Sequence, residues 1–274
     1  MINGIVFSKD RACQLNLLID SIEKNAKNIF ELKVIYTSSN NDFEEGYEKL
    51  INQYPEVKWI KESSNFKEDV LSSIQNTKSD YTCFFTDDDI IYRTLKEEDL
   101  TSKLKEDKDV FCFSTRLGLN TNKCYTMKCD NVIKPSFEDD NFISWDWKVH
   151  YMDFGYPLSV DGHIFRTKEI LKLTKKVSFS NPNTYEASLQ IFDNFPRNKM
   201  WSYKHSVLVN SPSNIVQSTF QNRKGETYGI STKDLNDAFL SGRFIELDKI
   251  DFSNIVGCHQ ELELPLTKLE LKEQ

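Results

Sequence analysis

The sequence predicts an α/β fold in which a mostly parallel central sheet is flanked by helices. Short apolar runs alternate with longer amphipathic stretches through residues 1–95, which is the pattern of right-handed βαβ units. The fourth run, Tyr81–Phe85, leads into three adjacent carboxylates, Asp87–Asp89. Because ligands of open α/β sheets bind outside the carboxyl ends of the strands, this run indicates both a strand and a site.

The first part of the chain is expected to contain four strands and three helices. The strands are short and apolar or aromatic, at Gly4–Phe7, Leu32–Tyr36, Val57–Ile60 and Tyr81–Phe85. The first helix has apolar residues at i, i+3, i+4 and i+7, namely Leu15, Leu18, Ile19 and Ile22. The other two helices are expected at Phe43–Gln53, which ends before Pro55, and at Phe66–Gln75.

Beyond residue 95 the alternation is less regular, and residues 116–149 are polar and aromatic by turns. The expected strands are Val110–Ser114, Leu158–Arg166 and Val207–Val209. The expected helices are Glu97–Lys105, Thr167–Lys175, Asn181–Phe192 and Ser231–Leu240. The last stretch, Gln260–Gln274, alternates apolar and charged residues, which predicts an edge strand or a partner-binding tail.

Composition limits the classes of function. The net charge of −7 argues against sequence-independent nucleic-acid binding, which needs a basic surface. It argues more weakly against contact with an anionic membrane, so peripheral membrane contact stays open. The sequence shows neither a signal peptide nor an apolar run of membrane-spanning length, which favours a cytoplasmic location.

The cysteines favour thiols over disulfides or a zinc site. Cys13, Cys83 and Cys112 lie in apolar contexts typical of reduced core residues. Cys124 and Cys129 are spaced C-x4-C without a second pair or a nearby His cluster, which matches zinc-binding spacing poorly.

The acidic triplet predicts a metal site. Side chains alternate along an extended backbone, so Asp87 and Asp89 are expected to face the same way. Closely spaced carboxylates repel one another, and a bound cation relieves this repulsion. Carboxylate oxygens favour Mg²⁺ or Mn²⁺. The alternative is a solvated acidic turn. The first strand is followed by Ser8-Lys9-Asp10-Arg11 in place of a glycine-rich loop, which argues against a dinucleotide fold and a P-loop.

Several segments together resemble the GT-A glycosyltransferases, specifically the family 2-like enzymes. The match rests on VFSKDRACQLNLLIDSI, VIYTSSNNDFEEGY, SSNFKEDVL, FFTDDDI, SVDGHIFRTKEIL and NTYEASL, in this order. It covers most of residues 1–210, and FFTDDDI resembles the D-x-D motif. Two features depart from the family. The loop Thr37–Asn41 lacks the Asp that often reads the donor base, and the Q-x-x-R-W of processive members is absent.

The resemblance implies a GT-A (Rossmann-like) fold and a domain organisation. Residues 1–95 form the nucleotide-sugar-binding half, and residues 96–210 form a mixed α+β acceptor-binding half of the same domain. Residues 211–274 form a lid loop, a helix and a tail. The implied function is metal-dependent transfer of one sugar from a nucleoside-diphosphate sugar, UDP-sugar favoured, to an acceptor hydroxyl. It would be inverting and non-processive, with a saccharide, lipid-linked or protein acceptor, in bacterial surface glycan or glycoconjugate synthesis.

The resemblance also implies roles for individual residues. Glu186 is the candidate general base, with Asp161 and Asp146 as alternatives, although a Glu in a first helical turn also interacts favourably with the helix dipole. Asp87 and Asp89 are the candidate ligands of Mn²⁺ or Mg²⁺, with Asp89 as the principal one. The candidate donor-binding residues are Ser8, Lys9, Arg11, Ser38, Asn40, Lys67, Asp87, Asp88, Gly162, His163, Arg223 and Lys224.

Each of these assignments has a plainer alternative. Arg11 can solvate the start of the first helix, and His163 can be a buried core histidine. Arg223 and Lys224 suit a lid that clamps a diphosphate, but equally an exposed loop. At the level of the whole protein, the alternatives are a GT-A-like nucleotidyltransferase, which the absent glycine-rich loop disfavours, and a non-catalytic glycan-binding module with a degenerate site.

Overall fold

The structure is a computed structural model that describes residues 1–192, 194–217, 219, 223 and 225–268. Its first part contains four parallel strands: β1 (Ile2–Lys9), β2 (Phe30–Thr37), β3 (Lys58–Lys61) and β4 (Tyr81–Thr86). The helices between them are α1 (Ala12–Asn25), α2 (Asn41–Gln53) and α3 (Phe66–Gln75). All the strands and helices expected for residues 1–86 are present; β1, β2 and α2 are two to four residues longer than predicted, and the other predicted bounds hold to within one residue.

The second part continues the same sheet with mixed strand directions. It contributes β6 (Val110–Ser114), β9 (Phe137–Glu138), β10 (Phe142–Asp146), β11 (His163–Arg166) and β12 (Lys199–Tyr203). Over the described residues, the sheet has nine strands in the order β3-β2-β1-β4-β11-β6-β12-β10-β9. Strand β11 runs antiparallel to both β4 and β6, so it joins the parallel part to the mixed part.

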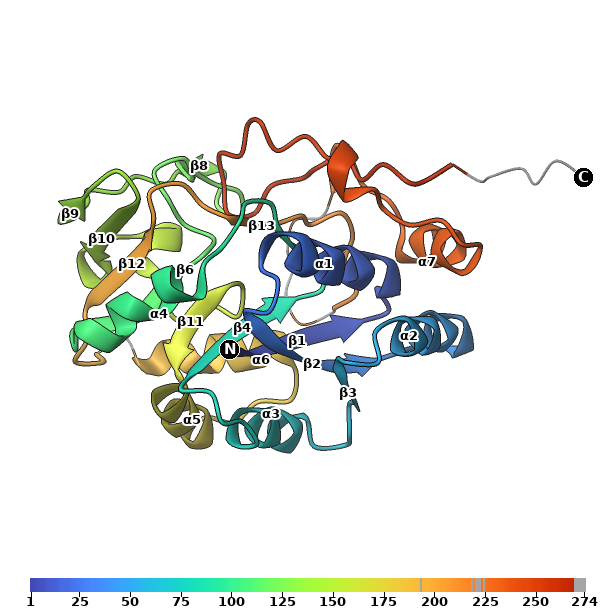
Figure 1. Cartoon of the computed structure of the whole chain (residues 1–274), viewed down its shortest axis with the longest axis horizontal. Helices are drawn as coiled ribbons and strands as arrows, with labels where there is room; N and C mark the ends of the chain where they lie inside the picture. The colour runs from blue at the N-terminus through green and yellow to red at the C-terminus, as the bar shows by residue number, and fades with distance from the viewer. Residues whose placement is uncertain (193, 218, 220–222, 224, 269–274) are drawn as a thin grey trace, which may run out of the picture.

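The remaining elements surround this sheet (Figure 1). The helices are α4 (Glu97–Glu106), α5 (Thr167–Lys176), α6 (Pro182–Leu189) and α7 (Thr232–Leu240). The short strands are β5 (Asp89–Ile91) with β13 (Leu208–Asn210), and β7 (Lys123–Cys124) with β8 (Cys129–Asp130). Single 3-10 turns are η1 (Trp147–Val149), η2 (Met152–Gly155), η3 (Gln190–Phe192) and η4 (Leu247–Lys249).

The alternation of side chains along the central strands builds a core on each face of the sheet. Val6 and Phe85 lie in a cluster with residues of α1 and α2, whereas Phe7 and Phe84 lie in a second cluster with residues of α3 and α5. In Figure 1, α1 and α3 accordingly lie on opposite sides of β1. Because both faces are covered, neighbouring positions of one strand are both buried and apolar, as at Val6-Phe7 and Phe84-Phe85.

Two expectations for the second half need correction. The run Leu158–Arg166 was expected to be one strand, but only His163–Arg166 is extended in the sheet. Gly162 has a φ of +67°, which ends the strand at that point, and the preceding residues form a loop. The described part of the tail, residues 260–268, forms no strand in the main sheet, and its strand-like pairing is the isolated bridge between Ile245 and Leu266. Residues 269–274 of the predicted tail lie outside the described residues.

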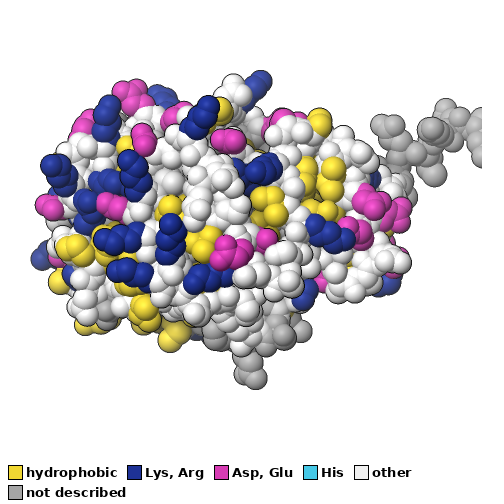
Figure 2. All heavy atoms as spheres, turned by 90° about the horizontal axis from the view of Figure 1, so that it is seen from below, with side chains coloured by type: hydrophobic (Ala, Val, Ile, Leu, Met, Phe, Trp, Pro, Cys, Tyr) yellow, Lys and Arg dark blue, Asp and Glu magenta, His cyan; other side chains and the backbone are white. Residues whose placement is uncertain are grey.

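Charged side chains of both signs are exposed on the surface. Figure 2 shows Lys and Arg side chains gathered towards the left of one face, with Asp and Glu side chains among them. Among the described residues, no helix has both the length and the apolar character needed to cross a membrane.

Candidate active site

A cavity of about 850 Å³ lies outside the carboxyl ends of the parallel strands. One wall comes from residues that follow these strands, including Ser8, Ser38 and Asp87. The opposite wall comes from the second half of the chain and includes Asp161 and Glu186. Strand β11 begins at this edge because it runs antiparallel to β4, so Asp161, just before it, lies beside the end of β4. The cavity therefore joins the two halves at the edge where a ligand was expected.

The acidic triplet is held by a buried arginine. The Nη1 group of Arg11 donates hydrogen bonds to Asp87 Oδ1 at 2.9 Å and to Asp88 Oδ2 at 2.8 Å. The same guanidinium also donates to the side chain of Asn214, which lies beyond β13. The second oxygen of Asp87 accepts from Ser8 Oγ at 2.9 Å and from the Lys9 amide at 3.1 Å. Arg11 thus pairs with two carboxylates and does more than solvate a helix start.

The pair of carboxylates facing the cavity is not the predicted pair. Residues 87 and 88 form a turn, so the alternation of an extended strand does not apply to them, and Asp87 and Asp88 line the cavity together. Asp89 begins β5 and does not line the cavity. Its buried carboxylate accepts from the Thr86 amide at 2.9 Å and from Asn210 Nδ2 at 3.1 Å. Asp89 therefore anchors the turn to its neighbouring strands.

The triplet carries more negative charge than Arg11 neutralises. Burial, with Asp88 adding to it and Arg11 opposing it, raises the pKa of Asp87 to about 6. Burial and the negative charges of Asp161 and Asp88 raise the pKa of Asp89 well above its usual range. Excess charge on carboxylate oxygens beside a cavity fits a divalent cation such as Mg²⁺ or Mn²⁺. The donor set of Asp87 and Asp88 therefore suits the predicted metal.

Asp161 is held in its ionised form. Its carboxylate accepts from Thr86 Oγ1 at 3.1 Å and from Arg116 Nη1 at 3.0 Å, and His259 Nε2 lies 3.2 Å away. Burial favours the neutral acid, but His259 and Arg116 outweigh it and lower the pKa of Asp161 to about 2. This residue is thus a fixed negative charge at working pH.

Glu186 has the opposite electrostatic environment. Helix α6 begins with a capping box in which the side chain of Asn181 accepts from the Thr184 amide and the Thr184 hydroxyl accepts from the Asn181 amide. Glu186 lies on the cavity side of this helix, and its Oε1 accepts from the Val160 amide at 3.1 Å. Burial, followed by the charge of Asp161, raises the pKa of Glu186, and Arg116 opposes this rise.

Nine of the residues predicted from the sequence line the cavity: Ser8, Lys9, Arg11, Ser38, Asp87, Asp88, Asp161, Glu186 and Arg223. Of these, Arg223 comes from the C-terminal part. Its guanidinium lies over the Tyr125 ring, 3.9 Å from the centroid, and forms an ion pair with Glu226 at 3.0 Å. Lys224, its predicted companion, lies outside the described residues.

Other predicted residues lie away from the cavity lining. Asp146 accepts from the Lys148 amide at the start of η1, and Asn40 caps α2 by accepting from the Phe43 amide. Lys67 reaches the backbone of Lys175. His163 is fully buried with Nδ1 2.9 Å from the Pro157 carbonyl, and burial lowers its pKa to about 3.

His163 is therefore a core histidine, the plainer of its two interpretations. Gly162, beside it, packs against Thr115, whose Oγ1 lies 2.4 Å from where a Cβ at position 162 would stand. The space beside Gly162 is therefore filled by side chains of the protein itself, those of Thr115 and Leu208.

The sequence analysis missed several residues of the site. Arg116, Asn210, Asn214 and His259 all line the cavity. Arg116 is the most informative omission, because a charge two residues after the apolar run Val110–Ser114 indicates a buried partner. His259 had a weaker signal, as one of only 4 histidines in the chain.

Comparison with known proteins supports this fold. No family model matches the chain. The chain is 26% identical over 251 residues to the bifunctional glycosyltransferase pgtA of Dictyostelium discoideum, covering 80% of this chain and 32% of that protein. Crystalline TarS of S. aureus superposes with a TM-score of 0.52 and 14% identity, covering 78% of this chain and 37% of TarS. A TarS fragment, residues 1–349 with UDP, gives a TM-score of 0.49 and 16% identity over 78% of this chain and 62% of the fragment.

The chain therefore spans about a third of the length of the curated relative and of the TarS chain with the TM-score of 0.52. The α/β fold with a large mixed sheet flanked by helices matches TarS, and the predicted GT-A fold class is confirmed. The resemblance to glycosyltransferases inferred from the sequence is confirmed by the relationship to pgtA.

Proposed function

We propose that the chain is a glycosyltransferase that moves one sugar from a nucleoside-diphosphate sugar, with a UDP-sugar favoured, to an acceptor hydroxyl. The observation that carries this proposal is the shared cavity. An acidic turn with its arginine lies on the side formed by residues 1–95, and a carboxylate with a raised pKa lies on the opposite side. Transfer from such a donor needs both a place for the diphosphate and a base for the acceptor.

The first half supplies the donor site in this proposal. Lys9 ends β1 and Arg11 comes two residues later; the Lys9 amide and the Arg11 guanidinium both donate to Asp87, and both residues line the cavity. Ser38 follows β2 and lines the same side of the cavity, where the base of the nucleotide would lie. Residues 96–210 then form the acceptor half, and residues 211–274 complete the wall through Asn214, Arg223 and His259.

We place the divalent cation at Asp87 and Asp88 in place of the predicted pair Asp87 and Asp89. The carboxylate of Asp89 lies outside the cavity lining, whereas those of Asp87 and Asp88 meet at one Arg11 nitrogen. A cation at this pair would compete with Arg11 for the same oxygens. When bound, Mg²⁺ or Mn²⁺ would neutralise charge on the departing diphosphate.

Glu186 is the general base in this proposal. Asp146 caps η1 outside the cavity lining, and Asp161 is too acidic to accept a proton near neutral pH. Glu186 combines a cavity position with a raised pKa, which brings it closer to the working pH of a base. A base that activates the acceptor for a single displacement corresponds to inversion at the anomeric carbon.

The proposal also covers the compartment, the acceptor and the biological setting of the reaction. We place the reaction in the cytoplasm, since the six cysteines are all free thiols, as a reducing compartment favours. The acceptor would be a saccharide, a lipid-linked glycan or a protein, and transfer would be non-processive. Bacterial surface glycan or glycoconjugate synthesis is the proposed setting.

The test is a thermal-shift panel of UDP-, GDP- and ADP-sugars with and without Mn²⁺, followed by measurement of donor hydrolysis. We expect one nucleotide class to raise the melting temperature with metal present, and Asp88→Asn to remove that rise. Asp146→Asn is the matched control, because its carboxylate lies outside the cavity lining, and it should behave like wild type. If no nucleotide sugar shifts the melting temperature and none is hydrolysed, the proposal is wrong.

A further inference from the structure

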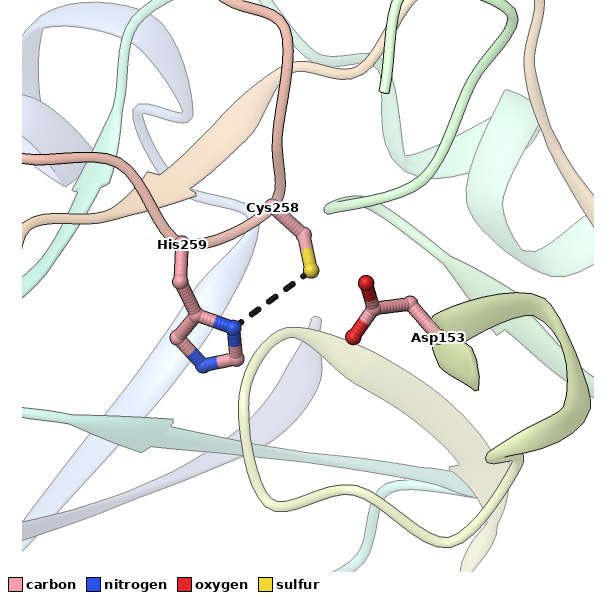
Figure 3. Close-up of side chains that lie close together, drawn as sticks. All are labelled: Asp153, Cys258 and His259. Carbon is pink, nitrogen blue, oxygen red and sulfur yellow. Dashed lines mark hydrogen bonds between the residues drawn. The ribbon is translucent and has the colours of Figure 1, made fainter. Parts of the chain in front are cut away.

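We propose that Asp153, Cys258 and His259 form a separate metal site of the zinc class in the wall of the cavity (Figure 3). Asp153 lies in η2, whereas Cys258 and His259 belong to the segment that follows η4. The inference concerns a different set of residues from the acidic turn and does not depend on the proposed sugar transfer.

The three side chains converge on one point. One potential ligand atom from each residue lies within 4.8 Å of the other two. Cys258 Sγ is 3.5 Å from His259 Nδ1, and Figure 3 shows the Asp153 carboxylate facing the same gap. Asp153 and Cys258 are buried, and His259 is half-buried. Three donors held this close by elements more than 100 residues apart in sequence need little rearrangement to share an ion.

One carboxylate oxygen of Asp153 is unsatisfied, which favours a bound cation at this cluster. Asp153 is 8% exposed, yet its Oδ2 has no hydrogen-bond partner among the described residues. A buried carboxylate oxygen without a partner is unfavourable, because it has lost its water and gained nothing in exchange. A metal ion in contact with Asp153 would remove this penalty.

The environment of His259 orients its ring for coordination. The Nε2 atom lies 3.2 Å from Asp161 Oδ2, and Arg116 Nη1 fixes that carboxylate at 3.0 Å. Metal-binding histidines commonly donate the hydrogen of one ring nitrogen to a carboxylate while the other nitrogen binds the metal. Asp161 would hold the proton on Nε2 and leave the Nδ1 lone pair directed at Cys258 and Asp153.

The donor atoms select the metal. One sulfur, one imidazole nitrogen and one carboxylate oxygen suit Zn²⁺, whereas Mg²⁺ and Mn²⁺ prefer oxygen ligands alone. Cys124 lies beside the Asp153 carboxylate and is a second sulfur within the neighbourhood. Binding would release the thiol proton of Cys258 to solvent as the thiolate forms the bond to the metal.

The site also has a route of entry. Cys124 and His259 each line both the large cavity and a second one of about 410 Å³ next to it. His259 of the cluster thus lies between the two cavities, and Asp153 faces the larger one. A metal here would tie the segment containing Cys258 and His259 to η2, and so would fix one wall of the active-site cavity.

Cobalt substitution tests the proposal on the full chain. The protein is stripped with a chelator and titrated with Co²⁺, and absorbance is recorded in the near-ultraviolet, where thiolate-to-cobalt charge transfer appears, and in the visible, where tetrahedral Co²⁺ absorbs. We expect one Co²⁺ per chain with a thiolate band, and displacement of that band by Zn²⁺. Asp161→Asn should weaken the affinity by about 10–100-fold without removing the band.

Matched variants separate this site from other thiols and from the proposed diphosphate metal. Cys258→Ser should lose the thiolate band, whereas Cys129→Ser and Asp88→Asn should keep it. Because Cys258 is buried, circular dichroism must show that the Cys258→Ser variant is folded. His259→Gln is a second variant, which removes one proposed ligand and keeps every cysteine. A wild-type protein without the band, or a band that persists in both Cys258→Ser and His259→Gln, would show that the cluster is an ion-pair network with Arg116 only.

Discussion

Asp161 and Glu186 line the same cavity, but their pKa values are shifted in opposite directions. Asp161 contacts Arg116 and His259 and keeps a pKa of about 2, while burial and the charge of Asp161 raise the pKa of Glu186. Environments that push two carboxylates apart in this way assign one as a fixed charge and the other as the group that exchanges protons. The assignment follows from the neighbours of each residue and not from its type.

A pH profile should detect this difference. Glu186 must be ionised to accept a proton, so kcat is expected to fall as the pH drops through its raised pKa, above the usual value for Glu of about 4.3. The profile is measured at saturating Mn²⁺, because a bound cation keeps Asp87 ionised although the pKa of this residue is raised to about 6. Asp161 stays ionised over the same range and adds no limb to the profile. Glu186→Gln should lower kcat by about 10²–10⁴-fold, remove the limb and leave donor affinity unchanged.

Asp146→Asn serves as the control for this experiment, and its acid limb should match wild type. An acid limb that survives unchanged in Glu186→Gln would rule out Glu186 as the base.

At the level of single residues, the sequence predicted the chemistry better than the geometry. The acidic triplet, Arg11 and Glu186 were found because their residue types stand out beside strands and helix starts. Arg116 and His259 were missed because their partners, Asp153 and Asp161, are far away in the sequence. Cys124 and Cys258 illustrate the same limit, since local C-x-x-C spacing says nothing about thiols that only the fold brings near each other.

Helix α6 positions Glu186, and its N-terminus is secured by Asn181. The side chain of Asn181 accepts from the Thr184 amide at 2.9 Å, and its Nδ2 donates to Thr219 Oγ1 at 3.3 Å. This one residue therefore couples the helix start to the segment that follows β13.

Removing this cap should affect both stability and turnover. Asn181→Ala is expected to cost about 0.5–2 kcal/mol of the free energy of unfolding and to lower kcat, because the first turn no longer holds Glu186 in place. Asn40→Ala is the matched control, since it removes an equivalent cap from α2 outside the cavity lining. Denaturant unfolding and steady-state kinetics measure both effects. Equal kcat in the two variants would contradict the positioning role.

Elements with strong periodicity were predicted well, and turns were not. Helix α3 has the predicted bounds of Phe66–Gln75, because its apolar stripe and the Asn65 cap both mark them. The turn at residues 87 and 88 was missed, because acidic residues after a strand do not reveal whether the chain stays extended. This turn determines which carboxylates face the cavity. Missing it therefore made the predicted metal-ligand pair wrong but left the predicted fold unchanged.

On the scale of the whole molecule, the two halves share one sheet and two cores. Strand β4 pairs with β1 on one side and with β11 on the other. Phe85 and Ile164 lie in one core cluster, and Phe84 and Phe165 lie in the other. The boundary near residue 95 therefore separates the proposed donor-binding part from the proposed acceptor-binding part, but it does not divide the hydrophobic core.

The chain should consequently unfold in a single transition over both halves. Trp59 is the tryptophan of the first half, and Trp145, Trp147 and Trp201 belong to the second. In a Trp59→Phe variant, fluorescence reports on the second half alone, while far-ultraviolet circular dichroism reports on both. Coincident midpoints in urea are expected. Two separated transitions would show instead that the halves are independent folding units.

The sequence predicted those parts of the fold that are formed by residues close together in the chain. The βα alternation of residues 1–86 predicted the parallel strands, since each unit is built from neighbouring residues. The order of the second half was not predictable in the same way, because β11, β6, β12 and β10 pair across long intervals and carry no register signal of their own.

The partners of the acidic turn also have a consequence for synthesis on the ribosome. Arg11 and Asp87–Asp89 are made early, but Asn210, which contacts Asp88 and Asp89, and Asn214, which holds Arg11, are made more than 100 residues later. A nascent chain that has reached only the first half therefore carries an acidic turn without these contacts. The contacts that hold the acidic turn and Arg11 are therefore completed late in translation.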